Sequence, residues 1–215
     1  AGIGGGFSLT EKNLIQDKLL EYEPDLFIVY DGWNDIDRPY SVHNEDSADY
    51  NLPTQILRNL VVKNEVIKIP GIIFKQYNFY KFANLEVYTM FNDENIIKKA
   101  EIWKDRWTEV CQIGLKKDFD VILALQPIVG TGEKILTDEE QMYFKKYDHE
   151  HLIPNYQNYA DQLDDIDDVC KNALDLRNAF DSETKTIFSD SGHVGDEGNR
   201  IIAKKLFETV YPILQ

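Results

Sequence analysis

The hydrophobic residues of this chain fall into short unbroken runs, separated by stretches with helical spacing. Leu26–Tyr30 and Asp120–Leu125 are rich in apolar, β-branched and aromatic residues with almost no alternation, and Ala173–Leu176 is a shorter run of the same kind. Such runs are typical of strands in a parallel sheet that is covered on both faces. The pattern therefore predicts three parallel strands, of which the first is buried on both sides.

The segments between these runs have the spacing of amphipathic helices. Trp103 and Trp107 belong to the apolar face of the longest one, which indicates a core position rather than a ligand platform. Two capping boxes, Ser8-x-x-Glu11 and Thr137-x-x-Glu140, mark helix starts. The expected helices are 8–22 with Ile15, Leu19 and Tyr22 on one face, 96–117, 137–147, one after Pro154, and one from Asn199 that carries Ile201, Ile202, Leu206 and Val210 inward.

Strands that alternate with helices predict an α/β protein, here a three-layer α/β/α sandwich with a parallel sheet. The 215 residues fit a single domain, 1–215. The regular pattern is lost between residues 36 and 95, where prolines and aromatic residues accumulate. We expect an insertion there, over the carboxyl end of the sheet, which serves either as a lid or substrate wall or as a packing or dimer surface.

The composition narrows the class of partner. A formal net charge of −15 argues against binding to nucleic acid or to an anionic membrane, because both require basic patches. No run approaches the roughly 18 apolar residues of a membrane span. Cys111 and Cys170 are too few for a disulfide framework and are not spaced as metal ligands. We expect two buried thiols, with a single bridge as the alternative.

Polar residues gather where the first strand ends. Asp31-Gly32-Trp33-Asn34-Asp35 follows directly on Leu26–Tyr30, and ligands of open α/β sheets bind at the carboxyl ends of the strands. An amide and two carboxylates at this point indicate a binding or catalytic site. The same residues also suit a loop in which Asn and Asp side chains bond their own backbone.

A second candidate site lies before the last helix. In Asp190-Ser191-Gly192-His193, the aspartate precedes the histidine by three residues within a turn-rich loop. The carboxylate can fold back to one imidazole nitrogen, which fixes the tautomer and leaves the other nitrogen as a general base. An isolated loop histidine is usually only solvated, but this spacing is more specific.

Taken together, these motifs resemble three sequence blocks of the SGNH hydrolase (GDSL esterase/lipase) family, in the family's order. The glycine loop Gly2–Gly6 resembles the second block, with Gly5 as the best match to its glycine. Gly32-Trp33-Asn34-Asp35 matches the third block, Gly-x-Asn-Asp, and Asp190 with His193 matches the fifth, Asp-x-x-His. The resemblance spans the chain outside residues 36–95.

The resemblance implies a flavodoxin-like SGNH fold and hydrolysis of an ester of a small molecule, glycan or lipid. His193 would be the general base and Asp190 its orienting carboxylate. The Gly5 N–H and the Asn34 side chain would form the oxyanion hole, while Gly32 and Asp35 would support their loop. No metal or cofactor is implied. The acyl group, the cellular location and the oligomeric state are not indicated.

The family's first block, Gly-Asp-Ser, holds the nucleophilic serine and has no match here. Gly6-Phe7-Ser8 imitates it, but no strand precedes Gly6 and no second-block glycine lies between Ser8 and Gly32. Ser8 is therefore expected to cap a helix. We expect the nucleophile and the family's first two strands to precede Ala1, so that the chain is an N-terminally truncated enzyme.

Three other interpretations remain open at this stage. Gly2–Gly6 and Asp31 superficially resemble a dinucleotide-binding site, although the glycine spacing differs from Gly-x-Gly-x-x-Gly. The chain could also be a non-catalytic, SGNH-like binding protein. His149 and His151 in Asp-His-Glu-His could suggest a metal site, but their polar surroundings favour surface positions.

Overall fold

A computed structural model describes residues 6–38, 40–43 and 93–215. Its three strands, β1 (Leu26–Asp31), β2 (Asp120–Leu125) and β3 (Asn172–Asp175), form one parallel sheet in the order β1-β2-β3. Leu26 lies opposite Asp120 in the first pair, and Ile122 lies opposite Asn172 in the second. The three predicted strands are therefore confirmed, with the third starting one residue earlier.

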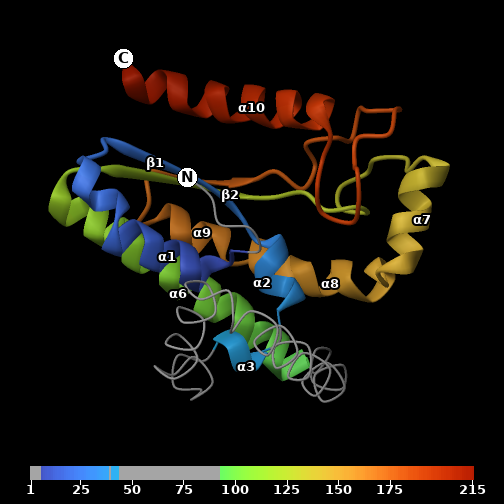
Figure 1. The fold of residues 1–215 in the computed structure, drawn as a ribbon, viewed down its shortest axis with the longest axis horizontal. Helices are drawn as coiled ribbons and strands as arrows, with labels where there is room; N and C mark the ends of the chain where they lie inside the picture. The colour runs from blue at the N-terminus through green and yellow to red at the C-terminus, as the bar shows by residue number, and fades with distance from the viewer. Residues whose placement is uncertain (1–5, 39, 44–92) are drawn as a thin grey trace, which may run out of the picture. The chain divides into compact units, whose positions relative to one another are not determined.

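Helices cover both faces of the sheet (Figure 1). The helices of the described residues are α1 (Ser8–Asp17), α2 (Trp33–Asp37), α3 (Tyr40–His43), α6 (Asp93–Lys117), α7 (Asp138–Lys146), α8 (His149–Ala160), α9 (Leu163–Asp167) and α10 (Asp196–Val210), with short 3₁₀ turns at Leu19–Tyr22 and Tyr211–Leu214. In the figure, α10 runs along one side of the sheet, whereas α1, α6 and α9 lie on the other. The predicted α/β/α layering is confirmed.

Successive side chains of β2 point to opposite faces of the sheet, and each face has a hydrophobic core of its own. Val121, Leu123 and Leu125 face the core that includes Trp103, Trp107 and residues of α8, whereas Ala124 faces the core that includes Ile202 of α10. Each of these side chains is buried. Successive strand residues point to opposite faces, so a strand enclosed on both sides is apolar at every buried position, as Val121–Leu125 is.

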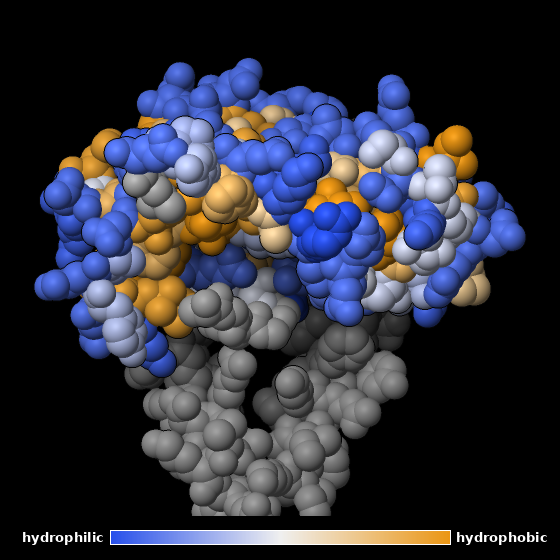
Figure 2. Space-filling view, turned by 90° about the horizontal axis from the view of Figure 1, so that it is seen from above, coloured by the Kyte–Doolittle hydropathy of each residue, from blue (hydrophilic) through white to orange (hydrophobic). Residues whose placement is uncertain are grey.

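The prediction that β1 is buried on both faces was wrong. Val29 and Asp31 are buried, but Ile28 is 46% exposed and Tyr30 is 36% exposed on the opposite face. Within the part of the chain that the structure describes, β1 pairs only with β2. Its other edge lies beside a groove of about 490 Å³, lined mainly by apolar residues of α1 and β1. The space-filling view shows hydrophobic side chains exposed beside a hollow in the surface (Figure 2).

The details of three helices differ from the expectations. The residue before α1 is Phe7, whose N–H is bonded to the hydroxyl of Thr10, so Ser8 is not the cap. Tyr22 is 79% exposed instead of facing the core. The helix α8 begins at His149 and includes Pro154, while α10 begins three residues before Asn199.

Cys111 of α6 and Cys170, just before β3, form a disulfide that spans 59 residues of sequence. The expectation of two free thiols was therefore wrong, and the alternative of one bridge is the one observed. The bond ties the helix that enters β2 to the chain that enters β3. It lies in the same core as Trp103 and Trp107, whose predicted core positions are confirmed.

The chain divides into two compact units, residues 1–36 with 100–215, and residues 37–99. The sheet and both candidate loops belong to the first unit. The expected insertion at 36–95 falls mostly outside the described residues. Among the described helices, none combines the length and the apolar character that crossing a bilayer requires.

Candidate active site

The structure brings Asp190 and His193 into contact. The imidazole Nδ1 lies 2.8 Å from Oδ2 of Asp190 and 3.0 Å from Oδ1. Oδ1 also accepts hydrogen bonds from the backbone N–H groups of Gly192 and His193, at 2.9 and 2.8 Å. The carboxylate therefore closes its own loop and orients the ring at the same time.

This pairing determines which imidazole nitrogen can act as a base. An ionised carboxylate only accepts hydrogen bonds, so Nδ1 carries the proton and Nε2 keeps its lone pair. Burial raises the pKa of the Asp190 carboxyl, but the N–H groups of Gly192 and His193 and the imidazole outweigh it and bring the pKa below the usual 3.8. The His193 side chain is 71% exposed, so Nε2 is accessible to a substrate.

The loop that carries the pair is closed at its base by backbone contacts. Phe188 and Val194 form an isolated antiparallel bridge. The N–H of Ser189 donates to the carbonyl of His193, and the N–H of Gly195 donates to the carbonyl of Ile187, each at 2.8 Å. The loop leads directly into α10, as the sequence predicted.

The other candidate loop leaves β1 through Gly32. Its φ of +127° lies in a region that L side chains rarely adopt, and a Cβ there would overlap Tyr156 and Leu125. Asn34 follows in the short helix α2, where it is half-buried. Gly5, the expected second oxyanion donor, lies outside the described residues.

Trp33 links the two loops. A Cβ added at Gly192 would lie 2.8 Å from the Trp33 indole, so the backbone of the Asp190–His193 loop passes directly over this ring. Asn34 is the next residue in the chain. Sequence reasoning treated the two loops as separate and did not assign Trp33 this role.

Two buried carboxyls support the Gly32–Asp35 loop from below. Asp31 accepts hydrogen bonds from the indole N–H groups of Trp103 and Trp107, at 2.9 and 3.2 Å. Asp35 accepts the backbone N–H of Ser8 at 2.9 Å. Burial raises the pKa of both carboxyls, that of Asp35 strongly, and the charge of Asp31 raises that of Asp35 further.

The position of Ser8 agrees with its rejection as the nucleophile. It is fully buried, its hydroxyl donates to Asp35, and it accepts a hydrogen bond of 3.0 Å from Arg106. Its partner lies 27 residues away, which local sequence cannot reveal. The buried position of Asp31, held by two indoles, likewise leaves it unavailable to a ribose in the dinucleotide interpretation.

The two histidines of Asp-His-Glu-His have different environments. His149 is fully buried with Nδ1 against the carbonyl of Val129, so the prediction of a surface position was wrong for this residue. It packs among Trp33, Phe144 and Tyr147, contacts that the polar sequence around it does not indicate. His151 is exposed and pairs with Asp148 at 2.7 Å. Among the described residues, no cluster of three or more potential ligands could hold a metal ion.

Comparison with known proteins identifies the fold. No protein-family model and no curated protein matches the sequence. The structure resembles that of an acetyl xylan esterase, AlAXEase, with a TM-score of 0.51 and 18% identity over 98% of this chain and 79% of that chain. It also resembles LAE5, an alpha/beta hydrolase enzyme from the metagenome of Lake Arreo, Spain, with a TM-score of 0.53 and 11% identity over 95% of this chain and 68% of that chain.

The chain has an α/β fold that these hydrolases share. At such low identities the likeness extends to the fold alone. The chemistry must therefore be argued from the residues of this chain.

Proposed function

We propose that this chain belongs to an ester hydrolase of the SGNH type. The contact between His193 and Asp190 carries the proposal, because it provides an oriented, accessible general base at the end of an α/β sheet. The fold shared with an acetyl xylan esterase supports the same class of reaction. The nucleophilic serine would lie on a segment upstream of Ala1.

The reaction is acyl transfer in two steps. Nε2 of His193 takes the proton of the serine hydroxyl as its oxygen attacks the ester carbonyl, and then gives that proton to the leaving alcohol. In the second step, water attacks the acyl-enzyme with the same proton transfers through His193, and the carboxylic acid is released. Asp190 stabilises the imidazolium that forms in each step.

Asn34 and the N–H of Gly5 would stabilise the tetrahedral oxyanion. Loss of one such donor typically lowers kcat by about 100- to 1000-fold. Asn34 is well placed for this role because its neighbour Trp33 touches Gly192, in the loop that carries the base. Gly32 and Asp35 would hold this loop in place, the first by its backbone conformation and the second through its hydrogen bond from Ser8.

Within the described residues, one edge of β1 is unpaired, which supports the proposed position of the serine. A strand paired there would lie in the groove beside β1, which Ile28 and Tyr30 help to line. If it ran parallel to β1, its carboxyl end would lie beside Gly32, because parallel strands end at the same edge of a sheet. A serine at that end would share the site with Asn34.

Hydrolysis of short-chain aryl esters tests the proposal. Two proteins are compared, the 215-residue chain and the same chain extended upstream to its natural start. We expect only the extended protein to be active, and His193→Ala to lower its kcat by about 100- to 10,000-fold. Acetylated xylan, suggested by the structural likeness, is the first natural substrate to try.

His151→Ala is the matched control, since His151 is also exposed and also pairs with an aspartate three residues before it. It should leave the rate unchanged. An extended, folded protein that is inactive on varied esters, or that keeps its activity in His193→Ala, contradicts the proposed mechanism. The site would then belong to a binding protein.

A further inference from the structure

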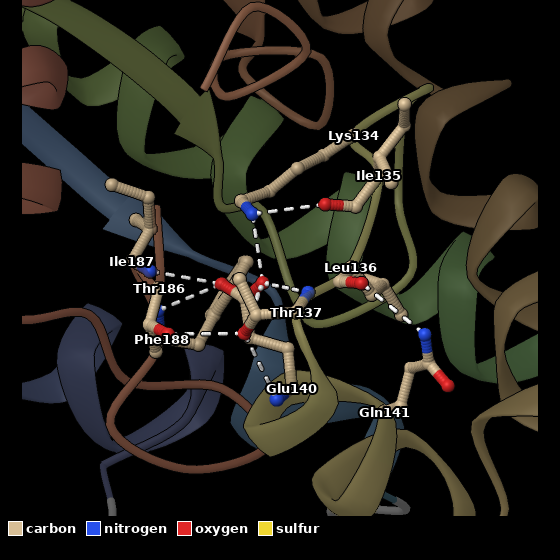
Figure 3. A network of polar contacts seen from close by, with 9 residues as sticks. All are labelled: Lys134, Ile135, Leu136, Thr137, Glu140, Gln141, Thr186, Ile187 and Phe188. Atoms are coloured by element: carbon tan, nitrogen blue, oxygen red, sulfur yellow. Dashed lines mark hydrogen bonds and ion pairs between the residues drawn. The ribbon is translucent and has the colours of Figure 1, made fainter. Parts of the chain in front are cut away.

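Beneath the Asp190–His193 loop, the buried carboxylate of Glu140 joins α7 to the chain entering that loop (Figure 3). Its Oε1 accepts the backbone N–H groups of Ile187 and Phe188, at 2.8 and 3.3 Å. Its Oε2 accepts the N–H of Thr137 at 3.0 Å and the ammonium of Lys134 at 2.7 Å. The two oxygens therefore serve different purposes, one facing the loop and the other facing the start of α7.

The ion pair keeps the Glu140 carboxyl charged inside the protein. The side chains of Glu140 and Lys134 are 0% and 2% exposed. Burial alone raises the pKa of this carboxyl, but the Lys134 ammonium and the backbone N–H groups of Ile187, Thr137 and Phe188 outweigh it and lower the pKa below its usual value. An ionised acceptor makes stronger hydrogen bonds to N–H groups than a neutral one.

The two N–H groups that Oε1 holds belong to the base of the loop. Phe188 forms the bridge to Val194, and the carbonyl of Ile187 accepts the N–H of Gly195. Asp190 is only two residues beyond Phe188. If the backbone at Ile187 and Phe188 shifted, the N–H groups of Gly192 and His193, which donate to the Asp190 carboxylate, would therefore move as well.

We propose that Glu140 is a positioning residue for the Asp190–His193 pair. Its effect on the loop is independent of the reaction, whereas its effect on the rate rests on the proposed function. Helix capping alone does not account for it, because the capping box is completed by Oε2 and Thr137, which leaves Oε1 to the loop.

The titration of Asp190 tests this role without requiring catalysis. Its pKa is measured from the carboxyl ¹³C shift in the 215-residue chain, assigned with Asp190→Asn. In Glu140→Gln the amide oxygen is drawn to Lys134, so the NH₂ group faces the N–H groups of the loop. We expect the Asp190 pKa to rise toward its usual value.

Glu139→Gln is the matched control, since Glu139 is the exposed neighbour and its hydrogen-bond partner is Tyr143. It should leave the Asp190 titration unchanged. Replacing the whole ion pair, in Lys134→Met/Glu140→Leu, removes the acceptor without leaving a buried charge unpaired, and such replacements often keep the fold. This variant should raise the Asp190 pKa as Glu140→Gln does. An unchanged Asp190 titration in either folded variant overturns the proposal.

The extended protein adds a readout of the rate. Displacement of a catalytic group by about 1 Å can lower kcat by about 100-fold. Because Glu140→Gln should displace His193, we expect kcat to fall by about 100-fold in this variant while KM changes little. A shifted Asp190 pKa together with an inactive wild-type protein would support the positioning role and reject the proposed function. An active enzyme whose kcat and Asp190 pKa are unmoved by Glu140→Gln would support the function and reject the positioning role.

Discussion

Gly192 is a point of close contact between the two candidate loops. Its Cα passes over the Trp33 indole with no room for a further carbon atom. The site therefore depends on a residue that carries no functional group, and whose importance follows only from a contact with a residue distant in sequence.

We expect Gly192→Ala to destabilise the fold by about 1–3 kcal/mol, the usual cost of forcing a methyl group into a packed site. In the extended enzyme it should also lower kcat, because the loop must move off Trp33. Gly195→Ala is the control, since the nearest atom to its Cβ would be the Ile187 carbonyl at 3.7 Å. Urea unfolding compares the two variants. Equal losses of stability would show that the contact with Trp33 does not cause the destabilisation by Gly192→Ala.

Glu11 carries the clearest pH dependence among the described residues. Burial and then the nearby charge of Asp31 raise the pKa of its carboxyl from 4.5 to about 8. A raised folded-state pKa contributes stability that is complete below pH 4.5 and is lost as the pH rises through 8. The wild-type protein should therefore become less stable across this range.

Glu11→Gln should remove this loss and stabilise the protein above pH 8 by at least about 1.4 kcal/mol, the equivalent of one pKa unit. Denaturant unfolding at several pH values measures it. Glu109→Gln should change the stability in the opposite direction. The hydrogen bond from Lys12 lowers the pKa of Glu109, so loss of this hydrogen bond is destabilising. A Glu11→Gln profile parallel to that of the wild type would contradict this assignment.

At the scale of elements, the sequence predicted correctly those features that depend on residues close together in the chain. The three strands and the Thr137 capping box follow from apolar runs and from residues three apart, and both are present. The contact of Asp190 with His193 could also be expected, because both residues lie within one turn.

The errors arose where a distant partner decides the outcome. Ser8 has the spacing of a cap but bonds Asp35 across the fold, and His149 is buried against Val129 despite its polar neighbours. An apolar run such as Leu26–Tyr30 likewise predicts a strand but not what covers each face. The described structure leaves Ile28 and Tyr30 exposed.

The Cys111–Cys170 disulfide joins α6 to the segment before β3, a bridge that the sequence offered only as an alternative. It closes a loop of 59 residues, for which the chain-entropy model gives a stabilisation of about 4 kcal/mol. We expect reduction to lower the free energy of unfolding by about this amount. Urea titrations with and without reductant measure the difference, and Cys111→Ala/Cys170→Ala should be insensitive to the reductant. Equal midpoints with and without reductant in the wild type would contradict the prediction.

At the scale of the molecule, the two sides of the sheet differ. The helix α10 covers one face, and α1, α6 and α9 cover the other (Figure 1). Across the sheet, β2 is enclosed, while β1 presents a free edge within the described residues. That edge contains neither lysine nor proline, the residues with which proteins commonly block pairing between edges.

The edge of β1 that is unpaired within the described residues has a consequence in solution, because we expect association through it to depend on ionic strength. Two copies that approach edge to edge gain backbone hydrogen bonds, but each carries a net charge of −15. The Debye length shrinks from about 10 Å at 0.1 M salt to about 3 Å at 1 M, so added salt weakens the repulsion while leaving the hydrogen bonds intact. We therefore expect the negative net charge to oppose pairing between copies in dilute buffer, and added salt to favour it.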